Sequence, residues 1–404
     1  MFDFLPWRAA LALTVFSSTS LFAELPKPAF EAQEIDKIQI GYGLAIGDVD
    51  GDKQPDILLA DKKEIVWYAN PGKAGAAWKK HIIAVNLTPL DNVCIAARDI
   101  DGDGKVEIAV GAMWNPGETN DESKSGAVFY LIRPEDPTQK WEAVKLHHEV
   151  TTHRMQWVRQ AKDKYVLVVL PLHGKGNKGG TGAAVKVLAY EVPKDPKGEW
   201  KTSVVDESMH MTHNFEVVHD PRQTSEPEVM VIGGKEGFRA VMREADGWIS
   251  NEAPFNGTSQ GVGEVRLGVA LKQKAIVAAV EPMHGSQLVA YVPKAQDGDD
   301  VNRVVLDDTI KEGHALACTD LLGLGRPQIV VGWRMPNKQV KVGVKLFVST
   351  DESASKWEQF LIDDNGMAAE DLKVADLDGD GKPEIIAAGR ATKNVKIYWN
   401  KSGK

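Results

Sequence analysis

The stretch Asp376-Leu-Asp-Gly-Asp-Gly-Lys-Pro-Glu384 decides the fold. Carboxylates occupy alternate positions at Asp376, Asp378 and Asp380, and Glu384 follows where the loop would close. An EF-hand would require a bidentate Glu at the twelfth position, which here is Ala387, and a helix on each side. The flanking runs are instead short, apolar and of strand length, which predicts a loop that joins two β-strands.

This loop occurs in two further intact copies, Asp48–Asp56 and Asp99–Glu107. Its hard oxygen ligands suit calcium, whereas the alternative is a turn rich in Asp and Gly that binds nothing. A fourth copy, Asp320–Gln328, has lost its ligands. The predicted structural calcium ligands are Asp48, Asp50, Asp52, Asp56, Asp99, Asp101, Asp103, Glu107, Asp376, Asp378, Asp380 and Glu384.

Apolar heptamers precede these loops and recur roughly every 50 residues. They are Tyr42–Asp48, Val93–Asp99, His153–Arg159, His213–His219, Arg266–Lys272, His314–Asp320 and Glu370–Asp376. Each is followed by further short strands, and the fourth strand of a unit often opens with Trp, as at Trp78, Trp141, Trp200 and Trp357. Repeats of about this length with four strands each predict an all-β fold, a seven-bladed β-propeller.

The two ends of the chain complete this prediction. The seventh unit stops after its third strand, and residues 29–36 resemble a fourth strand without a unit. We therefore expect the N-terminal strand to close the last blade, which removes the open sheet edges. Residues 24–404 would then form a single propeller.

Residues 1–23 have the form of a signal peptide, with Arg8 before an apolar core that ends in small residues near Ala23. We expect a periplasmic or secreted protein, with no other segment able to span a membrane. The formal net charge is −9, and acidic and basic residues are interspersed along the chain. No basic patch favours nucleic acid as a partner, and we expect a monomer.

The three intact Asp loops resemble the FG-GAP/VCBS family of calcium-loop propellers. That resemblance implies a propeller over the whole mature chain, with structural calcium on one face of the disc. It does not specify a function, because the family includes both adhesion modules and enzymes.

The residues that open the heptamers are expected at the opposite end of the innermost strands, around the central channel. His153, His213 and His314 take this position in three blades. Loops between second and third strands should reach the same face. They carry Trp114, His173, Lys235, His284, Trp333, Arg334 and Arg390. A funnel that gathers such groups is a reasonable functional site.

Two chemistries remain open for this funnel. Several imidazoles with one acid suit zinc or another divalent metal. The candidate ligands are His314, His284 and Glu264, and His153 and His213 could also serve as ligands. Alternatively, a histidine acts as general base, a tyrosine as acid, and arginine steadies an enolate-like charge. The predicted catalytic residues are His153, His213, Tyr42, Arg154 and Arg334. The predicted substrate-binding residues are Trp114, His173, Lys235, Trp333 and Arg390.

Both chemistries suit β-elimination on a carbohydrate or sugar-derived ligand. A looser resemblance points the same way: secreted propellers with central His, Tyr and Arg groups look like propeller polysaccharide lyases and the dehydratase half of aldos-2-ulose dehydratase. The resemblance implies a carbon–oxygen lyase, without residue roles. The alternative is a calcium-stabilised propeller that binds or adheres without catalysis.

Overall fold

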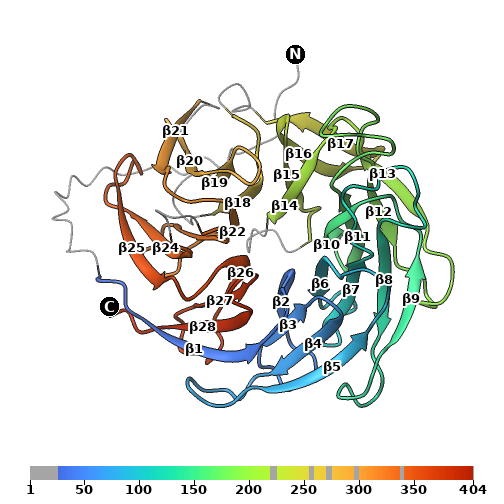
Figure 1. The fold of residues 1–404 in the computed structure, drawn as a ribbon, viewed down its shortest axis with the longest axis horizontal. Coiled ribbons are helices and arrows are strands. Elements are labelled where there is room, and N and C mark those ends of the chain that lie inside the picture. Colours follow the sequence, from blue (N-terminus) through green and yellow to red (C-terminus); the bar gives the residue numbers. More distant parts are fainter. Residues whose placement is uncertain are drawn as a thin grey trace.

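The computed structural model describes residues 26–218, 225–253, 259–269, 275–294, 300–336 and 341–403. These residues form strands and loops without a helix, arranged as seven four-stranded antiparallel sheets. Figure 1 shows the sheets as blades around a central axis, with β2, β6, β10, β14, β18, β22 and β26 innermost. The predicted seven-bladed propeller is confirmed.

The first four blades follow the chain in order. Their strands are β2 (Gly43–Gly47), β3 (Asp56–Ala60), β4 (Glu64–Ala69) and β5 (Lys79–Val85); β6 (Cys94–Arg98), β7 (Glu107–Ala112), β8 (Ala127–Ile132) and β9 (Glu142–Leu146); β10 (Thr152–Ala161), β11 (Lys164–Pro171), β12 (Val187–Glu191) and β13 (Thr202–Asp206); and β14 (Thr212–Val218), β15 (Val229–Gly234), β16 (Gly237–Glu244) and β17 (Gly247–Glu252).

The remaining blades complete the ring. Blade five contains β18 (Glu264–Gly268), β19 (Ile276–Glu281), β20 (Gln287–Pro293) and β21 (Val301–Asp307), and blade six contains β22 (Gly313–Thr319), β23 (Gln328–Trp333), β24 (Gly343–Ser349) and β25 (Trp357–Asp364). Blade seven contains β26 (Ala369–Ala375), β27 (Glu384–Gly389), β28 (Asn394–Asn400) and, as its outer strand, β1 (Phe30–Lys37).

The N-terminal strand closes the ring, as predicted. β1 pairs antiparallel with β28, from Phe30 opposite Asn400 to Lys37 opposite Asn394 (Figure 1). The segment that leads from β1 into blade one is held by the buried carboxylate of Asp61. This carboxylate accepts the backbone N–H groups of residues 39, 40 and 41 at 2.7 to 3.0 Å. Ring closure therefore rests on sheet pairing and on one buried acid.

Tryptophans fill the interfaces between neighbouring blades. Trp78 lies in an apolar cluster with Leu377 and Ile386 of blade seven, and Trp141 lies in one with Leu58 and Trp67 of blade one. These side chains are at most 8% exposed. Burying a large aromatic surface stabilises each interface by the hydrophobic effect. Their predicted structural role is confirmed.

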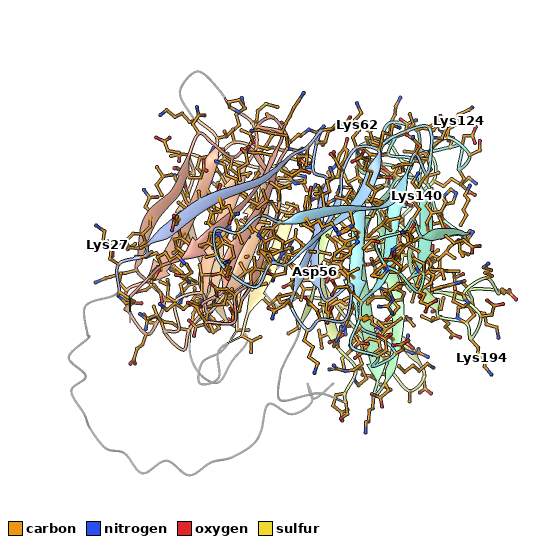
Figure 2. The ribbon with its side chains drawn as sticks, turned by 90° about the horizontal axis from the view of Figure 1, so that it is seen from below. Lys27, Asp56, Lys62, Lys124, Lys140 and Lys194 are labelled. Carbon is orange, nitrogen blue, oxygen red and sulfur yellow. The ribbon has the colours of Figure 1, made fainter. Side chains whose placement is uncertain are left out.

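The two faces of the disc carry different loops. Figure 2 shows Lys62 and Lys124, which follow second strands, at one edge of the disc, and Lys194, which follows a third strand, toward the other. The Asp loops join first and second strands, so they lie opposite the loops that hold Lys62 and Lys124. They occur in blades seven, one and two, which are consecutive around the ring.

Some predictions fall outside the described residues. The predicted signal peptide, residues 1–23, lies there, as do the last residues of two predicted heptamers, at positions 219 and 272. Within the described residues, no helix is long and apolar enough to cross a membrane.

Candidate functional site

The Asp loops fold with one shared geometry. In the blade-seven loop, Asp376 accepts the N–H groups of Gly379 and Gly381 at 2.9 Å, and Glu384 accepts that of Leu377 at 2.8 Å. The other intact loops repeat these bonds. In the fourth copy Asp320 likewise accepts two loop amides. The loop conformation thus survives where the ligands are lost.

Three carboxylates converge in each intact loop. Ligand atoms lie within 4.8 Å of one another in three groups, which are Asp48, Asp50 and Asp56; Asp99, Asp101 and Glu107; and Asp376, Asp378 and Glu384. Burial raises the pKa of the last acid in each loop (Asp56, Glu107 and Glu384) to about 7. One oxygen of Asp378 is buried without a hydrogen-bond partner. A hard divalent cation fits this donor set.

The fifth positions of the loops lie apart from these groups. Asp52 and Asp380 each accept the N–H of the residue two positions on, and Asp103 also lies 3.1 Å from Arg133. Asp52, Asp103 and Asp380 each use one carboxylate oxygen in a turn hydrogen bond, and their role as calcium ligands stays a prediction.

The opposite face gathers the histidines around the central axis. His153, His213 and His314 each sit at a β-bulge, where the inner strand slips one residue against its neighbour. A bulge redirects a side chain, and all three are at most 4% exposed. The shared register that was read from the heptamers therefore reflects a shared backbone irregularity.

The predicted register is wrong in blade five. Gly263 donates its N–H to Val280, as Val93 does to Gly111 in blade two, so Gly263 takes the position that the histidines occupy at the bulges of the other blades. Arg266 lies three residues further along β18, deeper in the channel. Glu264 directly follows the bulge position, which sets it behind the ring of His213.

Backbone carbonyls of the next blade orient two of the histidine rings. Nδ1 of His213 lies 2.7 Å from the Gly263 carbonyl, and Nδ1 of His314 lies 2.6 Å from the Glu370 carbonyl. In both cases the acceptor is the bulge-position residue of the following blade. Because a carbonyl only accepts, Nδ1 carries the proton and Nε2 keeps its lone pair in the neutral ring.

His284 meets these rings from the loop after β19. Its Nε2 lies 2.5 Å from Nε2 of His213, and the ring centroids are 4.4 Å apart. His213, His284 and His314 offer ligand atoms within 4.8 Å of one another. His284 has a left-handed backbone, with φ of 51°, which L-residues seldom adopt. Such a conformation at a functional group indicates a constrained position.

Desolvation favours the neutral form of His153, His284 and His314. Desolvation holds the pKa of His153 and of His314 well below the usual value, with Arg154 and Arg334 respectively as the next causes. The pKa of His284 is lowered as well, through desolvation and the neighbouring His213, although the residue remains partly exposed. Neutral imidazole is the form that binds metal.

Glu264 lies behind the histidines, away from the converging nitrogens. One of its carboxylate oxygens is 3.3 Å from Nδ1 of His213, and the other accepts a hydrogen bond from Asn214 at 2.6 Å. Burial alone would raise the pKa of Glu264, yet the proximity of His213 and the charge of Arg266 lower it. Predicted as a ligand, Glu264 is placed as an orienting acid.

His153 stands beside the trio and pairs with an aromatic ring. Trp114 stacks on it with centroids 5.0 Å apart, and the centroid of His213 lies 4.7 Å away. Nδ1 of His153 is buried without a hydrogen-bond partner. The structure thus brings Trp114 and His153 together, as the sequence predicts for the funnel.

A second chain of groups crosses blades six, seven and one. Arg334 contacts Glu312 at 3.1 Å and Glu370 at 2.6 Å, and Glu370 also binds Arg390 at 3.0 Å. Arg390 lies over the ring of Tyr42, 5.4 Å from its centroid. Desolvation raises the pKa of Tyr42 to about 12.

Glu370 was not among the predicted site residues, although it links two predicted arginines and also orients His314. The available signal was its place as the opening residue of the seventh heptamer. The negative charge of Glu370 offsets the positive charges of Arg334 and Arg390. Its hydrogen bonds hold both side chains in position.

The other predicted substrate residues lie further out. His173 is buried, and its backbone N–H donates a hydrogen bond to the hydroxyl oxygen of Thr151. Nζ of Lys235 donates to the Gly179 carbonyl at 3.0 Å, which ties the loop after β11 to blade four. Trp333 is 4% exposed within an apolar cluster of blade six. A packing role for Trp333 thus replaces the predicted ligand contact.

Comparison with known proteins confirms the resemblance. Residues 48–110 match the family model FG-GAP-like repeat, and residues 125–294 match the model Aldos-2-ulose dehydratase, beta-propeller domain. The sequence matches no curated protein.

Two solved structures are similar at low identity. The crystal structure of BBS1N in complex with ARL6DN, soaked with mercury, shares 13% identity with a TM-score of 0.49, covering 92% of this chain and 96% of that one. The form soaked with lead shares 12% identity with a TM-score of 0.47, covering 91% and 94%. So distant a likeness says nothing about binding or activity. The chain is therefore a seven-bladed β-propeller similar to FG-GAP-like repeats in one part and to the aldos-2-ulose dehydratase propeller in another.

Proposed function

We propose that the histidine funnel is the active site of a secreted carbohydrate lyase or dehydratase that holds a divalent metal, with zinc the best fit. The convergence of ligand atoms from His213, His284 and His314 carries this proposal. Two of these rings have their Nδ1 atoms committed to carbonyls, so their Nε2 lone pairs face the site. Three imidazoles with an open position are a known donor set of catalytic zinc.

A zinc ion bound there would act as a Lewis acid toward a substrate carbonyl. Burial holds the pKa of His153 well below its usual value, so its neutral ring is suited to accept the proton next to that carbonyl. The electron pair of the broken C–H bond then forms a C=C bond, and the C–O bond on the neighbouring carbon breaks. Tyr42 keeps its proton at neutral pH and is suited to donate it to the departing oxygen.

Carbohydrate as substrate is supported by the sequence match to the aldos-2-ulose dehydratase propeller and by an aromatic ring in the funnel. Calcium in the three Asp loops is proposed as structural, because those loops lie on the opposite face of the disc. Arg334 is proposed to hold Glu370 and His314 in place, since two carboxylates offset its charge.

The test is to load the purified chain with zinc and incubate it with a panel of aldos-2-uloses and oligosaccharides. Elimination would be followed by the ultraviolet absorbance of the unsaturated product. We expect turnover, and we expect its loss in the double variant His153→Ala/His213→Ala while thermal unfolding shows a folded protein. His81→Ala, an imidazole on outer strand β5, is the matched control.

A second candidate is a binding propeller without catalysis, favoured by the Asp loops and the FG-GAP match. It predicts that a sugar binds and is recovered unchanged, and that the histidine variants bind it equally well. Turnover that persists in the double variant would contradict the proposed lyase site.

A further inference from the structure

The central channel widens into a cavity of about 490 Å³ that is lined by the inner strands of all seven blades. Its lining includes the apolar residues Leu44, Ile95 and Leu316. It also includes polar and charged residues, which are Arg154, Gln156, Asn214, Arg266 and Asp371. A cavity of this volume accommodates a small organic ligand.

Arg154 stands where this cavity meets the histidines. It directly follows His153 on β10, and its charge lowers the pKa of His153, His284 and His314. The same charge lowers the pKa of Asp371 in blade seven. Arg154 lines the cavity together with residues of the other six blades, which places it at the channel.

The hydrogen-bond capacity of Arg154 is largely unused. A guanidinium has five N–H donors, and one bond, from Nη1 to its neighbour's carbonyl at His153, is 3.0 Å long. Across the described ranges, no carboxylate lies within ion-pair distance of it. Arg334, by contrast, contacts two acids.

The acids that face Arg154 already have partners of their own. Glu264 accepts from Asn214 at 2.6 Å and lies 3.5 Å from Arg266. Asp371 accepts the N–H of Leu44 at 2.8 Å and contacts Lys373 at 3.1 Å. Arg154 is therefore a cation that faces open space, and an anionic oxygen group would complete it.

We propose that Arg154 binds the carboxylate of the substrate, so that the funnel selects acidic sugars over neutral ones. This rests on the proposed function for the chemistry that follows, but the binding itself needs only Arg154 and the cavity. A planar carboxylate matches the guanidinium fork, which can donate two parallel hydrogen bonds.

The test compares ligands that differ only in one carboxylate. Binding of D-glucuronate against D-glucose, and of D-gluconate against D-glucitol, is measured by calorimetry on the full chain after chelation of divalent metal and dialysis into calcium. We expect the acid of at least one pair to bind at least about tenfold more tightly, as a charge-assisted bidentate contact allows. Metal removal ensures that a bound ion is not the carboxylate's partner.

Arg154→Gln should abolish this preference, and Arg154→Lys should retain part of it. Arg243→Gln, on β16, the third strand of blade four, is the control and should bind as wild type does. Equal affinity within both pairs, no binding of any of the four, or a preference that survives in Arg154→Gln would each overturn the proposal.

Zinc binding by the same variants separates this proposal from the preceding one. If Arg154→Gln binds zinc normally and loses only the acid preference, both proposals stand. If no variant and no wild-type sample binds zinc, the metal site fails, while the acid preference of the metal-free protein still reports on Arg154.

Discussion

Nε2 of His213 lies 2.5 Å from Nε2 of His284, although the two residues belong to different blades. Nδ1 of His213 is committed to the Gly263 carbonyl, so its Nε2 is not a donor in the neutral ring. The Nε2–H of His284 can donate to this lone pair, and a bound metal ion would replace that hydrogen bond. Each half of this contact is fixed by its own backbone, one by a β-bulge and the other by a left-handed turn.

His284→Asn should remove bound zinc and leave the fold intact. Asparagine tolerates the left-handed backbone at this position better than most residues do, so stability should change by less than about 1 kcal/mol. Zinc per chain is measured by elemental analysis beside His81→Ala, which should keep its metal. Full zinc occupancy in His284→Asn would contradict the assignment.

Glu264→Gln should weaken zinc binding about 10- to 100-fold, the usual effect of removing an acid that orients a ligating histidine. The substitution preserves size, and Asn214 can still donate to the amide oxygen. Zinc affinity is measured by competition with a chelator, while circular dichroism checks the fold. An unchanged affinity would show that Glu264 does not orient His213 for metal.

Asp378→Asn should reduce bound calcium from three ions per chain to two, because it removes one carboxylate charge from the blade-seven loop. We expect the midpoint of thermal unfolding in calcium to fall, since a bound ion stabilises only the folded state. Asp320→Asn, in the loop that lacks ligands, should leave the calcium count unchanged. An equal count in both variants would refute calcium binding at this loop.

Asp61→Ala should destabilise the fold by about 2 to 4 kcal/mol, because three backbone N–H groups lose a charged acceptor. The measurement is urea unfolding followed by tryptophan fluorescence. Asp121→Ala serves as control, since its partners Ser123 and Lys124 lie in an exposed loop, and we expect it to leave the unfolding midpoint nearly unchanged. Equal effects of the two substitutions would deny Asp61 a special role at the ring closure.

Glu228→Gln should cost about 3 to 5 kcal/mol, the usual effect of breaking a buried ion pair. Glu228 is 3% exposed and binds Arg98 through two bonds of 2.8 and 2.9 Å, with Arg159 at 3.5 Å. These residues join blades two, three and four. A loss below about 1 kcal/mol in urea unfolding would show that this network contributes little.

The sequence predicts the propeller because each level of the pattern agrees. Asp loops mark the first turn of a blade, and apolar heptamers mark the inner strands. The seventh unit lacks a fourth strand, which the N-terminal strand can supply. The histidine register follows from the same alignment. These features depend on local spacing, which a sequence displays directly.

The predicted register and residue roles were wrong where no recognisable motif fixes the position of a strand or the direction of a side chain. Blade five has no intact Asp loop, so its heptamer was aligned three residues late, and Gly263 was overlooked because glycine has no side chain to display. Glu264 changed from ligand to orienting acid because only the fold shows which nitrogen of His213 it faces. Trp333 was assigned to the funnel by its loop, whereas its ring packs into an apolar cluster.

The pairing of β1 with β28 has a consequence for biosynthesis. Phe30 and Asn400 meet only after the chain has been made almost to residue 400, so the first strand to appear must wait for the last. Until then blade seven lacks an edge, and the growing chain exposes strand edges that can pair wrongly. Contacts across so long a separation form slowly. Completion of the ring is therefore a late folding event, and it comes after synthesis of the whole propeller.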